Sequence, residues 1–289
     1  MLYLDREATR AALPMALAIE AMELAFSDDR ESPLRSQLGG SLFMPGRAGR
    51  YTAVKVVSIV PGNPVGIVVV FELNGSPLGL VDAPTLTAIR TGAAAGLATR
   101  LLANAEASVM AMLGAGAMAP DQIEAVKTVR PIERVLVWSR NLRRAEALAE
   151  LVGGEAVTDP DAAVAAAQVV SCATPSRSPL FSDGSVRPGT HINAVGAFTP
   201  DMCEVPSETV WRAYVVVDDL EAAAAEAGDL LQADRPPVCT MGDVLAGRHP
   251  QVGEDVTMFK SVGIASQDVA AAVAALEGAR EKGLGDPIG

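Results

Sequence analysis

The chain has 289 residues, is 49% hydrophobic and carries a formal net charge of −12. A strongly acidic balance opposes binding to nucleic acid or to an acidic membrane surface, so we expect a small-molecule partner. A chain of this length and apolar content can bury enough surface for two domains.

The cysteines and the start of the chain bear on the compartment. Cys172, Cys203 and Cys239 are widely spaced and form no CxxC pair, which is typical of a reducing compartment and argues against a metal site. The sequence shows no basic-then-apolar leader, and no apolar run reaches the roughly 18 residues that a membrane span needs. We therefore expect a cytoplasmic protein without a membrane partner.

The first third of the chain predicts a mixed domain. Residues 5–26 repeat apolar residues at helical spacing and end at "SDDRESP", which predicts one amphipathic helix. Between residues 41 and 86, the runs "YTAVKVVSIV", "GIVVVFEL" and "PLGLVDA" are separated by "PGNPVG" and "NGSP", which predicts antiparallel strands with turns. The first two runs are apolar at nearly every position, so both faces should be buried, and we expect a homodimer through this sheet.

The next segments predict a second domain of the Rossmann type. Residues 85–102, "TLTAIRTGAAAGLATRLL", predict a helix of small residues that leads into it. The runs "ASVMAML", "RVLVW", "VVSCAT", "HINAVG" and "AYVVVD" then alternate with helical stretches, which predicts an α/β fold with a doubly wound parallel sheet. The stretch "DVTMFKSVGIASQDVAAAVAALEGAREKG" predicts a long helix that folds back on the first domain. We therefore expect an α+β domain of residues 1–105 completed by 264–289, and a dinucleotide-binding domain of residues 106–263.

The segment "VMAMLGAGAMAPDQIEAV" contains a candidate phosphate loop. Gly114, Gly116 and Ala119 fit the GxGxxG/A pattern: the first glycine permits a tight turn, the second lets pyrophosphate approach the backbone, and the third small residue lets the helix pack on the sheet. The preceding strand and the following helix favour a dinucleotide site over a bare strand-to-helix turn. The other loop residues expected to contact the cofactor are Ala115, Ala117 and Met118.

The end of the next strand bears on the choice of nucleotide. NAD enzymes usually place Asp or Glu there to bind the ribose, whereas "VLVWSRN" places Ser139, Arg140 and Asn141. A guanidinium matches a 2′-phosphate in charge and geometry, and Arg143 and Arg144 add positive potential. We expect NADP(H) as the preferred cofactor and NAD(H) as a possible one; the alternative is that these arginines are solvated residues at a helix start.

Three cations of the first domain lie among apolar neighbours. Lys55 interrupts "YTAVKVVSIV", Arg90 lies in "TAIRTGAAAG", and Arg35 precedes them in "PLRSQLGG". A charge that faces the core needs an anionic partner, which makes the three candidates for a substrate site. The alternative is that each reaches solvent or pairs with a structural carboxylate.

Several stretches together resemble the ornithine cyclodeaminase and mu-crystallin family. They are "PLRSQLGG", "AVKVVSIVPGNP", "LTAIRTGAAAGLATRLL", "GAGAMAPDQIEA", "GTHINAVGAFTPDMCEV" and "TMFKSVGIASQDVAAA". The resemblance implies a substrate-binding and dimerisation domain, closed by the C-terminal helix and joined to a Rossmann domain. It implies that Arg35, Lys55 and Arg90 are catalytic residues that bind the substrate carboxylate. It assigns Thr174, Asn193, Val195 and Gly196 to the nicotinamide half of the cofactor, and Phe198 and Lys260 to the substrate pocket.

One departure from the family separates its activities. Ornithine cyclodeaminases have a stretch similar to "NAVGG" followed by Asp, whereas this sequence reads "NAVGAFTPDM" and has Phe198 at the position of that Asp. A phenyl ring accepts no proton, and cyclodeamination needs acid/base steps that reduction of a preformed imine does not. The family's ketimine reductases also lack this Asp and favour NADPH.

The resemblance thus implies an NADPH-dependent reductase of a small cyclic imino acid, such as Δ1-pyrroline-2-carboxylate or Δ1-piperideine-2-carboxylate, that forms the L-amino acid. The alternatives are an ornithine cyclodeaminase, an alanine dehydrogenase-like oxidoreductase, or a non-catalytic NADPH-binding and small-ligand-binding protein of mu-crystallin type. We expect His191 to be a hydrogen-bonded structural residue, His249 a loop residue, and Cys172 and Cys203 inert buried thiols.

Overall fold

The computed structural model describes residues 1–60, 65–249 and 255–289. They form two compact units, residues 1–94 with 264–289 and residues 95–263. The first boundary falls inside the helix α3 (Ala83–Leu102) rather than after it. Most of the expected turn "PGNPVG" lies outside the described residues. No helix in the described part of the chain is long and apolar enough to cross a membrane.

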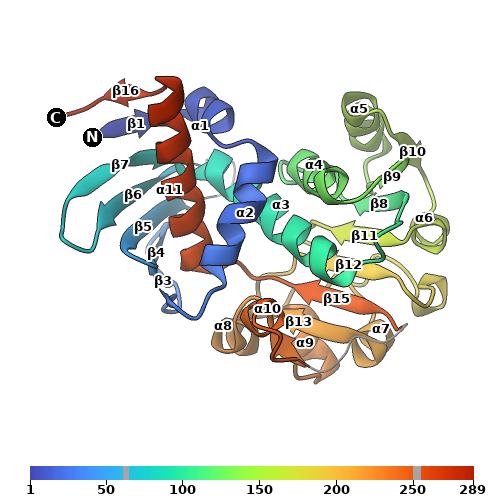
Figure 1. Ribbon diagram of the computed structural model, residues 1–289. Helices are drawn as coiled ribbons and strands as arrows, with labels where there is room; N and C mark the ends of the chain where they lie inside the picture. The colour runs from blue at the N-terminus through green and yellow to red at the C-terminus, as the bar shows by residue number, and fades with distance from the viewer. Residues whose placement is uncertain (61–64, 250–254) are drawn as a thin grey trace. The chain divides into compact units, whose positions relative to one another are not determined.

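The first unit is built on an eight-stranded sheet with the order β16-β1-β7-β6-β5-β4-β2, in which β3 also pairs with β4 (Figure 1). All pairs are antiparallel except β1 with β7. The three runs expected as antiparallel strands are confirmed as β5, β6 and β7. The strands are β1 (Leu2–Leu4), β2 (Arg30–Glu31), β3 (Ser36–Leu38), β4 (Ser41–Ala48), β5 (Tyr51–Ser58), β6 (Gly66–Glu72), β7 (Pro77–Asp82) and β16 (Asp286–Pro287).

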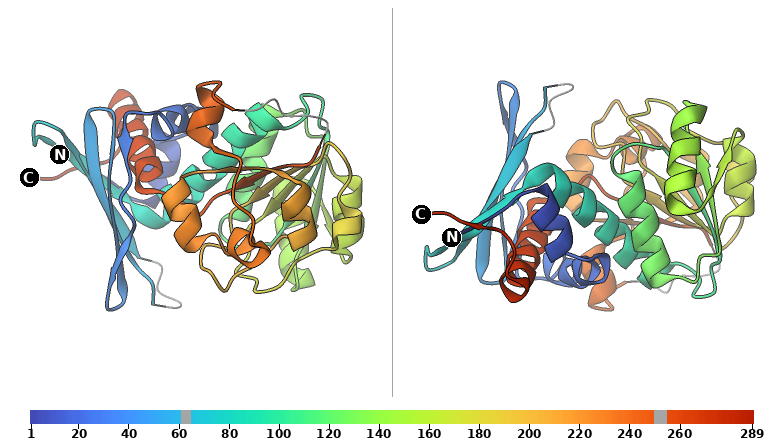
Figure 2. Two further views of the ribbon diagram at one scale, coloured as in Figure 1. Left: turned by 90° about the horizontal axis from the view of Figure 1, so that it is seen from below. Right: turned by 90° about the horizontal axis from the view of Figure 1, so that it is seen from above.

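Helices cover one face of this sheet. Figure 2 shows α2 (Met15–Ala25) and α11 (Ala265–Lys282) on that face, and no described helix of this unit on the other. Close packing depends on small residues: a Cβ added to Gly278 of α11 would collide with the Ala12 carbonyl of α1 (Arg6–Ala12), and one added to Gly46 of β4 would lie 2.6 Å from the Cβ of Ala265. The first turn of α11 is therefore held close to the sheet.

Two expected helices were wrong in their extent. Residues 5–26 form α1 and α2 instead of one helix, because Pro14 has no N–H to donate and disfavours helical backbone at Leu13. The long helix expected near the C-terminus begins only at Ala265, and Thr257–Lys260 forms the buried strand β15. A short apolar run has the same hydrophobic pattern in a buried strand as in a buried helix.

The second unit has an eight-stranded, fully parallel sheet with the order β10-β9-β8-β11-β12-β15-β13-β14. This confirms the doubly wound Rossmann fold, and the strand order reverses between β8 and β11. The strands are β8 (Val109–Leu113), β9 (Arg134–Trp138), β10 (Glu155–Val157), β11 (Val169–Cys172), β12 (His191–Ala194), β13 (Tyr214–Val217), β14 (Cys239–Thr240) and β15. The helices are α4 (Ala119–Val129), α5 (Leu142–Val152), α6 (Pro160–Ala166), α7 (Ser207–Arg212), α8 (Leu220–Glu226), α9 (Gly228–Ala233) and α10 (Met241–Leu245), with a 3₁₀ turn at Asp183–Ser185.

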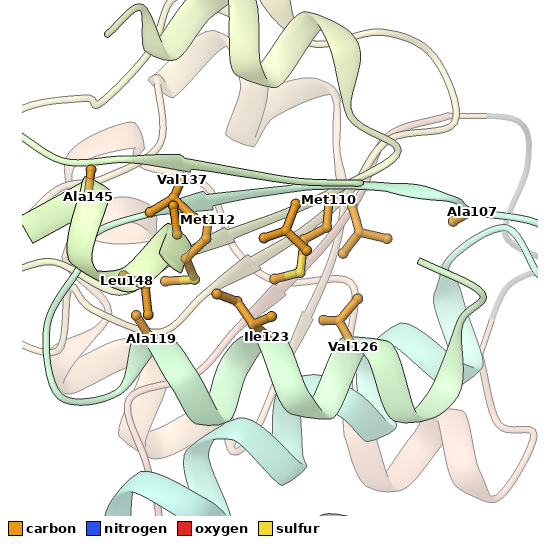
Figure 3. Packing of buried hydrophobic residues seen from close by; sticks show 12 residues of the cluster. Ala107, Met110, Met112, Ala119, Ile123, Val126, Val137, Ala145 and Leu148 are labelled. Atoms are coloured by element: carbon orange, nitrogen blue, oxygen red, sulfur yellow. The ribbon is translucent and has the colours of Figure 1, made fainter. Parts of the chain in front are cut away.

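An apolar layer holds α4 on this sheet. Met110 and Met112 of β8 and Val137 of β9 pack with Ile123 and Val126 of α4 in one buried cluster (Figure 3). Each of the five side chains is at most 2% exposed, and burying a side chain of this size stabilises a fold by about 1.5 to 3 kcal/mol. The cluster thereby fixes the start of α4 next to the end of β8, where the glycine loop lies.

Candidate functional site

A buried ionic cluster lies in the first unit. Nζ of Lys55 on β5 is 2.7 Å from Oδ2 of Asp268 on α11, and Nε of Arg90 on α3 donates to Oδ1 of the same carboxylate at 3.1 Å. Nη1 of Arg90 also donates to Oε1 of Gln267 at 2.8 Å. Lys55, Arg90 and Asp268 are 3%, 6% and 1% exposed. We call Lys55, Arg90, Gln267 and Asp268 the basic cluster.

The basic cluster holds more positive than negative charge. Two cations face one carboxylate, which leaves a net charge of +1 inside the unit. Burial lowers the pKa of Lys55 to about 8, and Arg90 and Arg35 act in the same direction, while Asp268 opposes them. Burial would raise the pKa of Asp268, but Lys55 and Arg90 lower it below its usual value. A buried, uncompensated cation is unfavourable, so the cluster suits an added anion.

A donor without a partner lies in the same cluster. Nε2 of Gln267 is buried and has no hydrogen-bond partner within the described residues. A buried amide without a partner is costly, and a ligand oxygen would satisfy it. Together with the excess positive charge, this donor makes a small carboxylate a chemically suitable ligand.

The sequence predicted the cations of the basic cluster but not their partners. Arg35 is half-buried, and its positive charge contributes to the lowered pKa of Lys55. Asp268 and Gln267 were missed because they lie 178 and 177 residues from Arg90. Their one signal is that an amide and an acid adjoin in the otherwise alanine-rich "SQDVAAAVAAL".

The second unit collects the predicted cofactor loops at one sheet edge. Leu113 of β8 pairs with Trp138 of β9 and with Cys172 of β11, and Cys172 pairs with Ala194 of β12. The loops after these four strands therefore begin at the same edge, beside the point where strand order reverses, where open α/β sheets bind ligands. These loops contain Gly114, Ala115, Gly116, Ala117, Met118, Ser139, Arg140, Asn141, Thr174, Val195 and Gly196.

The two glycines of the phosphate loop are explained by different features of the structure. Gly114 has φ +116°, and a Cβ there would lie 2.8 Å from the carbonyl oxygen of Ala173, so the chain itself requires glycine. A Cβ on Gly116 would meet nothing within 4 Å, and the residue is exposed. Met118 precedes α4 without a side-chain cap, so the first N–H groups of the helix are not satisfied by a side chain there. An open backbone and an uncapped helix start fit a pyrophosphate.

The end of β9 carries unpaired positive charge. Arg140, Arg143 and Arg144 are exposed and form no ion pair with a described residue. The backbone N–H of Asn141 donates to Oγ of Ser139 at 3.3 Å, and the side chain of Asn141 caps α5. The turn is thus ordered by its own polar groups, and the exposed guanidinium groups have the charge and geometry that a phosphate group requires.

A buried carboxylate that the sequence did not predict joins two of the loops. Oε1 of Glu204 accepts from the backbone N–H of Thr174 at 2.6 Å and from its hydroxyl at 2.8 Å. Oε2 accepts from the N–H groups of Gly196 at 2.7 Å and Ala197 at 3.1 Å. Burial raises the pKa of Glu204 to about 7. The fully buried Glu204 connects the loop after β11 to the loop after β12.

Two predicted site residues lie in the interior of the second unit. Asn193, expected beside the nicotinamide, is fully buried; its amide donates to the hydroxyl of Thr99 at 2.9 Å and its oxygen lies 3.1 Å from Nε2 of His191. Lys260, expected in the substrate pocket, is fully buried with Nζ 2.8 Å from Oδ2 of Asp229. Both lie within strands buried on both faces, which the motif alone does not reveal.

The structure also shows the surroundings of Phe198, the two histidines and the cysteines. Phe198 is 45% exposed in the loop after β12, and it brings no proton acceptor there. Burial lowers the pKa of His191 to about 4, so it is a neutral structural residue. His249 precedes an undescribed segment, with Nδ1 3.3 Å from the hydroxyl of Tyr214. The cysteines are free and buried, and burial raises the pKa of the Cys203 thiol to about 12.

Known proteins are similar to this chain in sequence and in fold. A Δ1-pyrroline-2-carboxylate reductase of Bacillus cereus is 34% identical over 324 residues, covering 100% of this chain and 99% of that protein. A solved Δ1-pyrroline-2-carboxylate reductase of Thermococcus litoralis, in complex with NADH and L-proline, matches with a TM-score of 0.91 at 31% identity and covers 100% of both chains. An archaeal alanine dehydrogenase dimer with bound NAD matches with a TM-score of 0.91 at 30% identity, covering 100% of this chain and 99% of that one.

The family model for ornithine cyclodeaminase/mu-crystallin matches residues 29–283. This match spans the basic cluster, the phosphate loop and the loops that Glu204 joins. The chain therefore belongs to the ornithine cyclodeaminase/mu-crystallin family.

Proposed function

We propose that this chain is a cytoplasmic, NADPH-dependent reductase of a small cyclic imino acid of the Δ1-pyrroline-2-carboxylate or Δ1-piperideine-2-carboxylate type. The observation that carries the proposal is the basic cluster, whose two buried cations share one carboxylate. An imino acid brings the carboxylate that the cluster is short of. The similarity to Δ1-pyrroline-2-carboxylate reductases over the whole chain supports the same substrate class, and the free cysteines suit a reducing compartment.

In this proposal, Arg90 and Lys55 bind the substrate carboxylate, and Arg35 adds to the positive field. NADPH, when bound by the phosphate loop and the arginines after β9, supplies the hydride for the imine carbon. A protonated imine accepts hydride far better than a neutral one, and Lys55, with a pKa of about 8, can hold the required proton near neutral pH. The protonated imine becomes the amino acid when it gains one hydride, and no further base is needed. This is consistent with Phe198 at the position where ornithine cyclodeaminases have Asp.

A second candidate is reductive amination of a 2-oxo acid, as in an alanine dehydrogenase. The similarity to the archaeal alanine dehydrogenase favours it, because the basic cluster would also accept the carboxylate of pyruvate. The two candidates differ in whether the imine forms before or after binding.

The direct test is to follow NADPH oxidation by absorbance with a panel of substrates. We expect turnover of Δ1-pyrroline-2-carboxylate or Δ1-piperideine-2-carboxylate, and slower turnover of pyruvate with ammonia. Faster turnover of pyruvate with ammonia would favour the second candidate. Release of ammonia from ornithine would contradict the interpretation of Phe198, and a protein that binds NADPH but reduces none of these compounds would be a binding protein.

The basic cluster makes a quantitative prediction. Arg90→Ala removes a charge-assisted contact to the substrate carboxylate, which costs about 2 to 4 kcal/mol of transition-state stabilisation. This corresponds to a fall in kcat/KM of about thirty- to thousand-fold. The affinity for NADPH, measured by fluorescence titration, should stay near that of the wild type and serves as the internal control.

Lys55→Met tests the same site while keeping the apolar stem. Because the pKa of Lys55 is about 8, its charge is lost as the pH rises through 8, and KM for the imino acid should rise there in the wild type. The variant should have a high KM with no such rise. If both variants remain folded and reduce the imino acid at wild-type rates, the cations are structural and the proposed clamp is wrong.

The preference for NADPH over NADH is part of the proposal, supported by the free arginines after β9. Arg140→Ala should raise KM for NADPH by about tenfold or more and leave KM for NADH nearly unchanged, because only NADPH carries a 2′-phosphate. Arg134→Ala is the matched control, since Arg134 is exposed at the opposite end of the same strand and pairs with Glu155. A wild-type preference for NADH, the cofactor in the Thermococcus complex, would show that these arginines do not select the nucleotide.

The uncovered sheet face supports a homodimer. Inward residues of β5 and β6 are buried, while the outward residues remain only half-buried within the chain. Val54, Val56, Ile67, Val69 and Phe71 form this outward face, and cross-strand pairing places Val54 opposite Val69 and Val56 opposite Ile67. A contiguous apolar face of this kind favours burial against a second copy.

Light scattering at micromolar concentration should therefore give the mass of a dimer. Val69→Glu places a charge at the centre of the outward face and should shift the protein towards monomer, because an unpaired carboxylate is costly to bury. Leu151→Glu is the control, as Leu151 is 72% exposed on α5 of the second unit. A monomeric wild type, or a dimer unaffected by Val69→Glu, would count against this interface.

A further inference from the structure

We infer that Glu204 is a positioning residue for the dinucleotide, because its carboxylate holds the loops after β11 and β12 in one arrangement. The inference rests on the proposed function, which assigns Thr174 and Gly196 in these loops to the nicotinamide half of the cofactor. It adds Glu204, which the family motif did not single out, and it explains how Thr174 and Gly196 are held in place.

Within the part of the chain that the structure describes, four donors bind Glu204, and all of them come from the two loops. The N–H and hydroxyl of Thr174 bind one oxygen, and the N–H groups of Gly196 and Ala197 bind the other. Each carboxylate oxygen thus serves one loop, and the side chain fixes the spacing between them. Hydrogen bonds to an ionised acceptor are about twice as strong as neutral ones, so the bridge is suited to hold loops in place before a ligand arrives.

Position 196 needs glycine because the two loops are so close at this bridge, and not to leave room for a ligand. A Cβ there would collide with the backbone of Thr174 and lie 2.5 Å from Oε1 of Glu204. In contrast, a Cβ on Gly116 would meet nothing within 4 Å. The two glycines of the site therefore serve different purposes: one keeps the loops together and the other leaves the backbone open.

Glu204 is itself held by a second carboxylate. The backbone N–H groups of Glu204 and Val205 donate to Oδ1 of Asp229 at 2.6 and 3.0 Å, and Oδ2 of Asp229 lies 2.8 Å from Nζ of Lys260. Lys260 is thus part of this network. It anchors Asp229, which anchors the segment that carries Glu204.

The ionisation of Glu204 gives the bridge a pH dependence. Burial raises its pKa to about 7; Asp229 on α9 acts in the same direction, and Lys260 on β15 and the bonds from Thr174 oppose them. The thiol of Cys172 on β11 also interacts with Glu204, and burial raises the pKa of this thiol well above its usual value. As the pH falls through about 7, protonation replaces one acceptor site with a donor, and the loops should loosen.

The test uses the full-length protein and two readouts that do not depend on turnover. In Glu204→Gln, the amide nitrogen faces groups that are themselves donors. We expect the Kd for NADH at pH 8 to rise by about tenfold or more. We also expect faster hydrogen exchange at the amides of Thr174, Gly196 and Ala197 in the ligand-free variant. The amide of Val195, which donates to the carbonyl of Cys172, should stay protected.

The pH profile separates positioning from general stability. In the wild type, the affinity for NADH and the protection of the loop amides should fall together between pH 8 and 6, each measured relative to the variant at the same pH. NADH is used because it has no 2′-phosphate to titrate. Glu204→Gln should bind weakly at every pH without this transition. Glu208→Gln, which makes the same charge change at an exposed residue four positions on, should behave as the wild type.

Gly196→Ala opens the bridge from the other side and keeps Glu204, so its exchange pattern should match that of Glu204→Gln. Unchanged NADH affinity and unchanged exchange in Glu204→Gln would overturn the inference. So would loss of protection at Val195 together with the loop amides, since that would indicate a purely structural role. A wild-type protein that binds NADH but reduces no imino acid would contradict the proposed reaction and leave this inference standing.

Discussion

Asp268 allows two cations to be buried in the first unit, and much of the architecture follows from that constraint. Lys55 lies in the middle of a strand and Arg90 in the middle of a helix, where each would be costly to bury without a counter-ion. The carboxylate comes from the first turn of α11, and Gly46 allows that turn to lie close to β4. The first unit therefore has to include residues from both ends of the chain. One carboxylate for two cations also leaves the charge that a substrate anion can neutralise.

The balance of buried charge in the second unit is opposite to that in the first. There, Glu204 and Asp229 share one ion pair, with the buried cation Lys260, and their remaining negative charge is satisfied by backbone N–H groups of the chain itself. The first unit thus has one buried cation more than it has buried carboxylates, whereas the carboxylates of the second are satisfied within the chain. The start of α4 has no side-chain cap, and the arginines after β9 form no ion pair with a described residue. This division of charge fits a substrate and a cofactor that are both anionic, in a protein whose net charge is −12.

Sequence patterns predicted the elements far better than the contacts between them. The alternation of apolar runs and helices predicted the parallel sheet, and the unusual placement of Lys55 and Arg90 predicted cations that face the core and need an anionic partner, because both signals are local. The partners Asp268 and Glu204 have no local signal. Asp268 lies in the first turn of a helix, where an acid is usually solvated and stabilised by the helix dipole, and the stretch "DMCEVP" around Glu204 has no hydrophobic periodicity. Lys260 and Asn193 show the converse, since a family motif gives their position along the chain and not their burial. Pro14 was a local signal against one continuous helix, and the hydrophobic periodicity on both sides obscured it.

The origin of Asp268 near the C-terminal end also affects how the protein can be made. Domains generally fold as units during synthesis, in the order in which their residues emerge. The second unit is continuous, so it can fold on the ribosome, while Lys55 and Arg90 are synthesised early and have no counter-ion until α11 emerges. During that interval, the strands of the first unit carry charges that are unfavourable to bury and apolar residues that are unfavourable to expose. The synthesis of α11, after the second unit, therefore provides both the missing helix of the sheet and the missing counter-ion of the basic cluster, and a chain interrupted before Asp268 would lack both.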